Sequence, residues 1–265
     1  MTIETINGRK VGVSRAGTGP PMLLLHCALA HRGALAALIT KLGEMAFTSF
    51  DLPGHGQSEF DQSTDIQRQA CETAITLLEQ ADGPSHIFGH SFGGTVALKV
   101  ALMRPDLVRT LSLYEPVYFS LLAKANPTAY AAEARAAEGF TTAAQAGNWP
   151  EAARAFLARW SMEGFDTLPS AQRAYVLQTI PLIMACAPSI VEPESGADTL
   201  AGLAELRCPV LLMQGGCSPA VIGAINQAIA SRAPDVQLHK LNAAGHMGPI
   251  THAGAVAALM VGHML

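Results

Sequence analysis

The residue of this chain best suited to covalent chemistry is a serine flanked by glycines. Residues 89–94 read Gly-His-Ser-Phe-Gly-Gly; an apolar run precedes them and a helical pattern follows. Small flanking residues allow a tight turn from strand to helix, which projects the hydroxyl of Ser91 at the edge of a sheet. Amides at the start of the helix can then bind an oxyanion. Because such a spacing also arises by chance, its strand-before and helix-after context is what supports Ser91 as a nucleophile.

A serine hydroxyl is a weak nucleophile that needs a general base, and the chain has nine histidines. His246 lies between the last predicted strand and the last predicted helix, in a loop that can reach over the edge of the sheet. His86 and His239 fall inside predicted strands, and His252 falls inside the predicted final helix. His90 is next to the serine but points elsewhere from the turn. We therefore predict His246 as the base.

The elements that must position these residues follow the pattern of a parallel α/β sheet. Short apolar runs alternate with longer helical patterns in the first half of the chain and again near its end, as in βαβ units. The predicted strands are 10–14, 22–26, 47–51, 86–89, 110–114, 209–214 and 236–241. The predicted helices between them are 67–80, 92–103, 220–231 and a last helix from about 251.

The middle of the chain has a different pattern. From about residue 119 to residue 194 we find no convincing strand, but several Ala-rich helical segments separated by prolines. We predict that residues 119–194 form a helical cap, inserted into one core that consists of residues 1–118 and 195–265. Such a cap roofs a site and shapes its pocket.

The aromatic and basic residues of this cap bear on its ligand. Most of its apolar side chains are expected to form the core of the cap itself, but some must face the cavity. We predict Trp160 as a pocket residue and a small-molecule substrate with an apolar or aromatic portion. Arg154, Arg159 and Arg173 could bind a carboxylate, although a solvated helix face explains them equally well.

Composition excludes several classes of protein. Of the 265 residues 49% are hydrophobic and only 14% are charged, which provides for a sizeable core. A net charge of −4 without a basic block argues against nucleic acid as a partner. The first ten residues do not resemble a signal peptide and no apolar run could span a bilayer, so we expect a cytoplasmic protein without membrane insertion. The composition permits a monomer as well as a homodimer.

The cysteines do not suggest a disulfide framework or a metal site. Five are scattered along the chain without a ligand spacing, and an odd number of this kind is typical of reduced thiols. The chemistry outlined above needs only protein atoms. We therefore expect neither a metal nor an organic cofactor.

Four landmarks resemble the α/β-hydrolase superfamily over nearly the whole chain. In order, they are the strand that ends in Leu-His at 25–26, the D-x-x-G-x-G-x-S turn at 51–58, the nucleophile turn at 89–94 and Gly-His at 245–246. The resemblance implies a mostly parallel eight-stranded sheet with helices on both faces and an inserted helical cap. It also implies a structural role for His55 and a triad in the order serine, acid, histidine.

The first departure from the family's pattern concerns the oxyanion hole. Cys27 stands where the family usually has a glycine after the first landmark strand. The resemblance still implies an oxyanion hole formed by the amides of Ala28 and Phe92, and Cys27 would then line the substrate pocket. A nucleophilic Cys27 is the lesser alternative, because no base is evident beside it.

The second departure concerns the acid. The family most often has an aspartate after the seventh strand, where this chain has Ser218. The sixth strand ends at Glu115, and some α/β-hydrolases, including a group of haloalkane dehalogenases, supply the acid from that strand. We therefore predict Glu115 as the triad acid. The alternatives are that Glu115 is a helix cap or surface carboxylate and that Asp198 or a water-supported dyad takes its place.

These residues predict acyl transfer. Ser91 attacks a carbonyl carbon, His246 takes its proton, and water then releases the acyl group. The leading hypothesis is a hydrolase of a small carboxylic ester, a lactone or the C–C bond of a diketone, which the resemblance does not separate. Two other classes remain open: cofactor-free peroxidase-type or lyase chemistry on the same triad, and a ligand-binding protein with a residual hydrolase site.

Overall fold

Three strands form the buried centre of the sheet. β3 (Pro21–Leu25), β5 (Ser85–His90) and β6 (Val108–Tyr114) lie side by side, and nearly all of their side chains are buried. Strands that are covered on both faces bury side chains on both faces, and β3 does so with the continuous apolar run Met22–Leu25, whereas β5 and β6 also bury polar side chains. The structure, a computed structural model, describes residues 2–264.

Eight strands form one sheet in the order β1-β2-β4-β3-β5-β6-β7-β8. The other strands are β1 (Thr2–Ile6), β2 (Arg9–Ala16), β4 (Ala46–Phe50), β7 (Val210–Gly215) and β8 (Val236–Leu241). β2 runs antiparallel to both of its neighbours, and the other five pairs are parallel. The predicted mostly parallel sheet is confirmed. Within the described part of the chain, no helix has both the length and the apolar character needed to cross a membrane.

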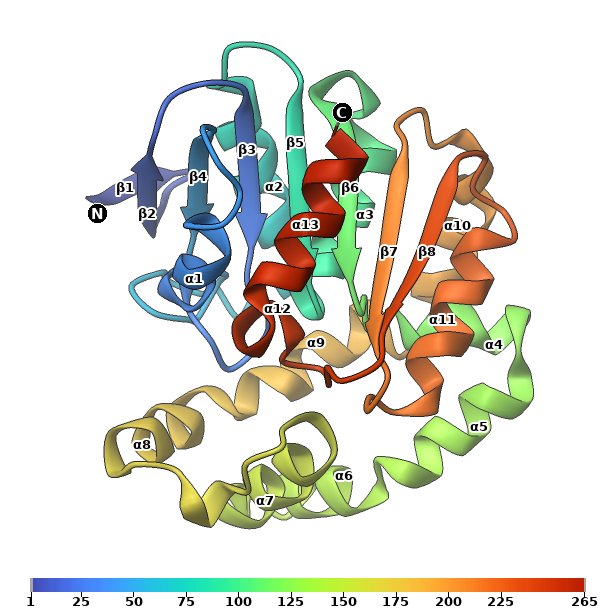
Figure 1. Cartoon of the computed structure of the whole chain (residues 1–265). Coiled ribbons are helices and arrows are strands. Elements are labelled where there is room, and N and C mark those ends of the chain that lie inside the picture. Colours follow the sequence, from blue (N-terminus) through green and yellow to red (C-terminus); the bar gives the residue numbers. More distant parts are fainter. Residues whose placement is uncertain (1, 265) are drawn as a thin grey trace.

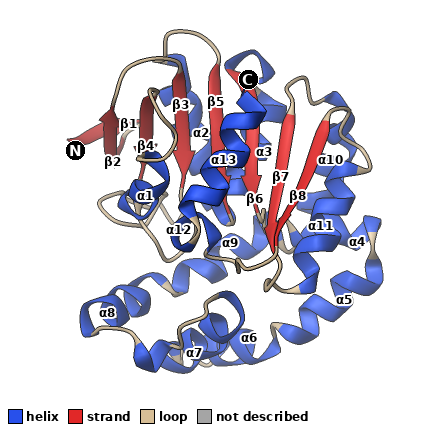
Figure 2. Ribbon diagram, viewed as in Figure 1, coloured by secondary structure: helices blue, strands red, loops and turns tan. Residues whose placement is uncertain are grey.

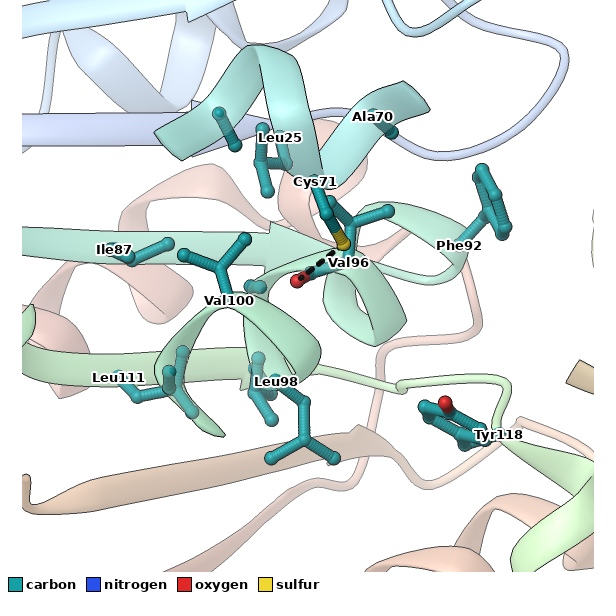
Figure 3. Close-up of a cluster of buried hydrophobic side chains, with 14 of the residues drawn as sticks. Leu25, Ala70, Cys71, Ile87, Phe92, Val96, Leu98, Val100, Leu111 and Tyr118 are labelled. Carbon is teal, nitrogen blue, oxygen red and sulfur yellow. Dashed lines mark hydrogen bonds between the residues drawn. The ribbon is translucent and has the colours of Figure 1, made fainter. Parts of the chain in front are cut away.

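Helices cover both faces of this sheet (Figure 2). Successive strand residues point to opposite faces. In β3, Leu25 packs into the cluster that includes α2 (Ile66–Glu79) and α3 (Phe92–Met103), part of which Figure 3 shows. Leu24 belongs instead to the cluster on the face covered by α13 (Ala253–Met264). The predicted α/β layering is therefore present on both sides.

The remaining helices of the sheet region are short or lie at its flanks. α11 (Ala220–Ala230) belongs to the same cluster as α2, and α1 (Ala36–Ile39) and α12 (Gly248–Thr251) contact α13. Three short 3-10 helices complete this region, namely η1 (Arg32–Leu35), η2 (Pro105–Leu107) and η5 (Leu203–Glu205).

A helical segment separates β6 from β7. Its elements are η3 (Phe119–Leu121), α4 (Leu122–Ala125), α5 (Pro127–Ala136), α6 (Glu138–Gln145), α7 (Trp149–Trp160), η4 (Phe165–Thr167), α8 (Ser170–Thr179), α9 (Pro181–Ile190) and α10 (Pro193–Gly202). Figure 1 shows α5 to α9 as a layer across the carboxyl ends of the central strands. A separate cluster of buried apolar residues lies inside this layer, so many of its apolar side chains pack among themselves.

Prolines in this segment mostly begin helices. Pro127, Pro150 and Pro181 lie in the first turn of α5, α7 and α9. A proline has no N–H to donate, and the first amides of a helix have no partner within it, so these positions tolerate proline at little cost. Pro188 is different, because it lies inside α9.

Two side chains of the helical layer hydrogen bond to the sheet region. Tyr175 in α8 donates from its hydroxyl to the carbonyl oxygen of Ala30 at 2.7 Å and accepts from the amide of Gly56 at 3.0 Å. Ser189 in α9 donates to the carboxylate of Asp65, the residue that also caps α2. These contacts fix α8 and α9 over the loops at the ends of β3 and β4.

Candidate active site

The turn between β5 and α3 presents Ser91. Its backbone has a φ of 57° and a ψ of −117°, a conformation that L residues rarely adopt. A Cβ on Gly89 would lie 2.5 Å from the carbonyl oxygen of Gly93 across the turn, and a Cβ on Gly93 would collide with the carbonyl oxygens of Leu25 and His26 at the end of β3. The two glycines of the motif are therefore required by close backbone contact.

Three side chains from three different loops meet at this turn. Nε2 of His246 lies 2.9 Å from Oγ of Ser91, and Nδ1 of His246 lies 2.7 Å from Oε2 of Glu115. All three residues are buried, and Glu115 is fully inaccessible to solvent. A carboxylate can only accept, so Nδ1–H donates to Glu115 and Nε2 is free to accept from the serine hydroxyl. The structure brings the three predicted residues together in the order that general-base catalysis requires.

The carboxylate of Glu115 has three hydrogen-bond donors. Besides the imidazole, Oε1 accepts from the amide of Gly215 and from the hydroxyl of Ser218, both at 2.5 Å. Glu115 itself has a φ of 50°, which turns its side chain from the end of β6 toward the loop after β7. A buried charge needs such donors to offset the loss of water. Asp198, the alternative acid, is exposed on α10.

Two further side chains bond to the loop that carries the histidine. His90, at the end of β5, places Nε2 at 2.8 Å from the carbonyl oxygen of His246. The hydroxyl of Tyr114, at the end of β6, donates to the carbonyl oxygen of Gly245 at 2.8 Å. Burial, together with the neighbouring His246, lowers the pKa of His90 well below its usual range, so its ring is neutral and donates from Nε2. Sequence reasoning missed both contacts.

The loop after β3 contains the predicted oxyanion amide. Ala28 and Phe92 both line the cavity beside Ser91. Phe92 is the first residue of α3, so its amide has no acceptor within the helix. Leu29 has a φ of 59° and donates its amide to Nε2 of His55 at 3.2 Å, while Nδ1 of His55 donates to a backbone carbonyl in its own loop. His55 thus fixes the backbone next to Ala28.

The structure differs from the expectation at Cys27. Its side chain is buried, with 3% exposed, and it is not among the residues that line the cavities next to the serine and histidine. The next residue, Ala28, forms that part of the wall instead. Burial raises the pKa of the Cys27 thiol to about 12, which disfavours the nucleophilic thiolate.

A cavity of about 530 Å³ lies beside Ser91, and its walls are mostly apolar side chains from α5, α6, α7 and α9. Trp160 lines this cavity, and its ring lies edge to face with that of His246 at a centroid distance of 4.7 Å.

The three candidate arginines are bonded to other groups of the helical segment. Arg159 pairs with Glu133, Arg154 pairs with Asp166, and Arg173 donates to the carbonyl oxygen of Asp166. Across residues 2–264 no three His, Cys, Asp or Glu side chains are grouped as metal ligands.

Comparison with known proteins agrees with this architecture. The family described as "Alpha/beta hydrolase family" matches residues 22–259. A pimeloyl-[acyl-carrier protein] methyl ester esterase of Methylococcus capsulatus is 28% identical over 94% of this chain and 96% of its own length. The lipase LipV of Mycobacterium tuberculosis is 37% identical, but the match covers only 39% of this chain and 41% of the lipase. An esterase from Exiguobacterium antarcticum has a similar structure, with a TM-score of 0.77 over 99% of this chain and 98% of the esterase at 16% identity. The chain therefore belongs to the alpha/beta hydrolase family.

Proposed function

We propose that this protein is a serine hydrolase of small carboxylic esters, including cyclic esters (lactones), and that residues 119–194 act as the cap over its site. The observation that carries the proposal is the unbroken chain of hydrogen bonds from Ser91 through His246 to Glu115. The names of two relatives, a lipase and a methyl ester esterase, also favour ester hydrolysis.

The proposed cycle has two halves. Oγ of Ser91 attacks the carbonyl carbon as Nε2 of His246 takes its proton, and the carbonyl π electrons move to the oxygen, which the amides of Ala28 and Phe92 stabilise. When the tetrahedral adduct collapses, the leaving oxygen takes the proton from the imidazolium and departs as an alcohol. Water then repeats the sequence on the acyl-enzyme and restores the serine. Glu115 keeps the imidazole oriented and stabilises its positive charge.

The C–C bond of a diketone is the third substrate class that this triad suits. It differs in the leaving group, which is a carbon that must be protonated rather than an oxygen. Hydrolysis of p-nitrophenyl butyrate without cleavage of a β-diketone selects the ester class.

The proposal is tested by reaction with a fluorophosphonate, followed by mass spectrometry of the modified peptide. We expect one adduct, on Ser91, and no adduct in Ser91→Ala or His246→Ala. An adduct on Cys27 would show that the nucleophile is wrong. No adduct on a folded protein, combined with tight ligand binding and no turnover, would favour a binding protein. Turnover of peroxide with acetate, or of a cyanohydrin, but not of aryl esters would favour peroxidase-type or lyase chemistry.

A further inference from the structure

A second cavity, of about 680 Å³, adjoins the catalytic histidine. The loop after β3, the α7–α8 region and the loop before α12 form its walls. It shares three lining residues with the first cavity: Arg159, Trp160 and His246. Both cavities lie within the range of roughly 300–1,000 Å³ that is typical of small-molecule sites.

The two cavities differ in which part of the proposed catalytic machinery they reach. Ser91 and the two candidate oxyanion residues, Ala28 and Phe92, line only the first cavity. His246 lines both. The first cavity therefore gives access to the nucleophile, whereas the second gives access to the proton carrier alone.

A stack of side chains separates the two spaces. The indole of Trp160 contacts the ring of His246, and the guanidinium of Arg159 lies over the indole at 5.2 Å from its centroid. Two hydrogen bonds, of 2.9 and 2.8 Å, join Arg159 to the carboxylate of Glu133. A bidentate pair of this kind fixes the position of the arginine and so restricts the indole. Trp160 is therefore a fixed partition rather than a free side chain.

The order in which bonds form and break indicates which cavity binds the acyl portion of the ester and which binds the alcohol portion. After the first step the acyl group stays on Oγ of Ser91, so it occupies the space next to that atom. The leaving oxygen must take its proton from Nε2 of His246, so the group attached to it lies on the histidine side. We propose that the first cavity binds the acyl group and the second binds the alcohol portion, which rests on the proposed ester hydrolysis.

The lining of each cavity narrows the substrate class. The first is mostly apolar, and the charged side chains that the structure describes in its wall do not leave a buried free cation: Arg159 is paired with Glu133, and Arg135 is exposed and lies in the same wall as Glu138. The second combines apolar residues such as Leu157 and Met247 with the polar groups of His31 and Gln172. A methyl or ethyl group would leave most of this space empty and its apolar walls wet. The substrate class is thus an ester of an uncharged apolar acid with a bulky, mainly apolar alcohol.

The test uses one matched substitution in each cavity. Ala187 in α9 lines only the first cavity and Ala34 in η1 lines only the second; both are partly buried. We would compare Ala187→Phe and Ala34→Phe on two substrate series. The acyl series runs from p-nitrophenyl acetate to p-nitrophenyl octanoate, and the alcohol series runs from methyl to octyl butyrate. The ratio of kcat/KM for the longest to the shortest substrate is independent of the fraction of active enzyme.

The wild type should prefer the longer alcohols in the alcohol series. We expect Ala187→Phe to lower the long-to-short ratio by about tenfold in the acyl series and to leave the ratio in the alcohol series unchanged. Ala34→Phe should do the reverse. Where a phenylalanine variant does not fold, the leucine variant at the same position replaces it, with a smaller effect in the same series.

The assignment would be overturned by effects of both variants on one series, by exchanged effects, or by a wild type that prefers methyl butyrate. Failure of the proposed function would look different. A protein that hydrolyses no member of either series and forms no fluorophosphonate adduct on Ser91 would refute ester hydrolysis itself. A protein that labels at Ser91 and hydrolyses both series, but shows no separation between the two variants, would refute the cavity assignment alone.

Discussion

Ser218 donates a hydrogen bond of 2.5 Å to Oε1 of Glu115, so the residue at the family's usual position for the acid binds the carboxylate that we propose as the acid. Neighbouring parallel strands make this contact feasible. β6 and β7 pair with Tyr114 opposite Met213, and Glu115 therefore leaves β6 where the chain of β7 turns toward Ser218. In the proposed triad, the position after β7 therefore acts on the histidine indirectly, through a hydroxyl that binds Glu115.

Replacing Ser218 by alanine should weaken the orientation of Glu115. The carboxylate loses one of three donors, and a hydrogen bond to a charged group contributes about 1.5–3 kcal/mol, so we expect kcat/KM to fall about ten- to a hundredfold. Ser218→Thr, which keeps the hydroxyl, is the control. A wild-type kcat/KM in Ser218→Ala would contradict this role.

Replacing Glu115 by glutamine tests the acid itself. An amide keeps the shape of the side chain but cannot stabilise the imidazolium or enforce the same tautomer, so kcat should fall by about 10³–10⁴. The same change at Glu72, which pairs with Arg9 and Arg68 away from the site, should leave kcat unchanged. Urea unfolding of both variants measures whether they are folded. Near wild-type turnover in Glu115→Gln would show that Glu115 has a structural role and is not the triad acid.

The sequence was sufficient to identify the central strands and the three residues that meet at the site. Strands buried on both faces favour continuous apolar runs, and β3 and β7 have them. β1, by contrast, carries no such run: four of its five side chains are not buried, so no apolar pattern marks it, and no predicted strand covered it. The glycine spacing around Ser91 reflects close backbone contacts, which any chain with this turn must satisfy.

The supporting residues could not be predicted in the same way. His90 and Tyr114 bond to carbonyl oxygens that lie 156 and 131 positions away in the sequence, and a backbone carbonyl leaves no mark on residue type. The sequence also could not show which of two neighbouring side chains faces the cavity, and Ala28 lines it rather than Cys27. The signal available for His90 was that a polar residue stands at the end of a buried strand, next to Ser91. Such a residue must find a hydrogen-bond partner, but its type does not identify that partner.

Removing the hydroxyl of Tyr114 should loosen the loop that carries His246. Tyr114→Phe removes one of the two donors to the carbonyl oxygen of Gly245, which keeps the amide of Gly248, so the loss should cost about 0.5–1.5 kcal/mol of unfolding free energy. Because the loop holds the base, kcat should fall while KM changes little. Tyr118→Phe is a matched control, since Tyr118 is equally buried and its hydroxyl bonds to Thr199 away from this loop.

The comparison of these two variants separates positioning from stability. Both should lower the midpoint of urea unfolding by similar amounts, and only Tyr114→Phe should lower kcat. Equal kcat values in the two variants would mean that the hydroxyl of Tyr114 stabilises the fold without orienting the histidine.

The protein should lose stability as the pH falls below about 6.5. Burial lowers the pKa of His55 from 6.5 to about 4, and its Nε2 already accepts the amide of Leu29. Between these two pKa values the unfolded chain binds a proton that the native ring does not. The contribution of His55 to the free energy of unfolding is therefore fully present above about pH 6.5 and is lost as the pH falls to about 4. The loss from His55 amounts to about 3 kcal/mol over this range. His26 has a pKa shifted in the same direction by burial and accepts the amide of Leu52, so it adds to the effect.

Urea unfolding at pH 7.5, 6 and 5 measures this dependence. His55→Asn should be less stable than the wild type at pH 7.5 but lose less stability between pH 7.5 and 5, because one of the titrating rings is gone. His239→Asn, which changes an exposed histidine on β8, should keep the wild-type slope. Since His55 also fixes the backbone beside Ala28, acid should reduce turnover in the wild type before global unfolding is complete. A slope in His55→Asn equal to that of the wild type would show that His55 does not contribute to the acid sensitivity.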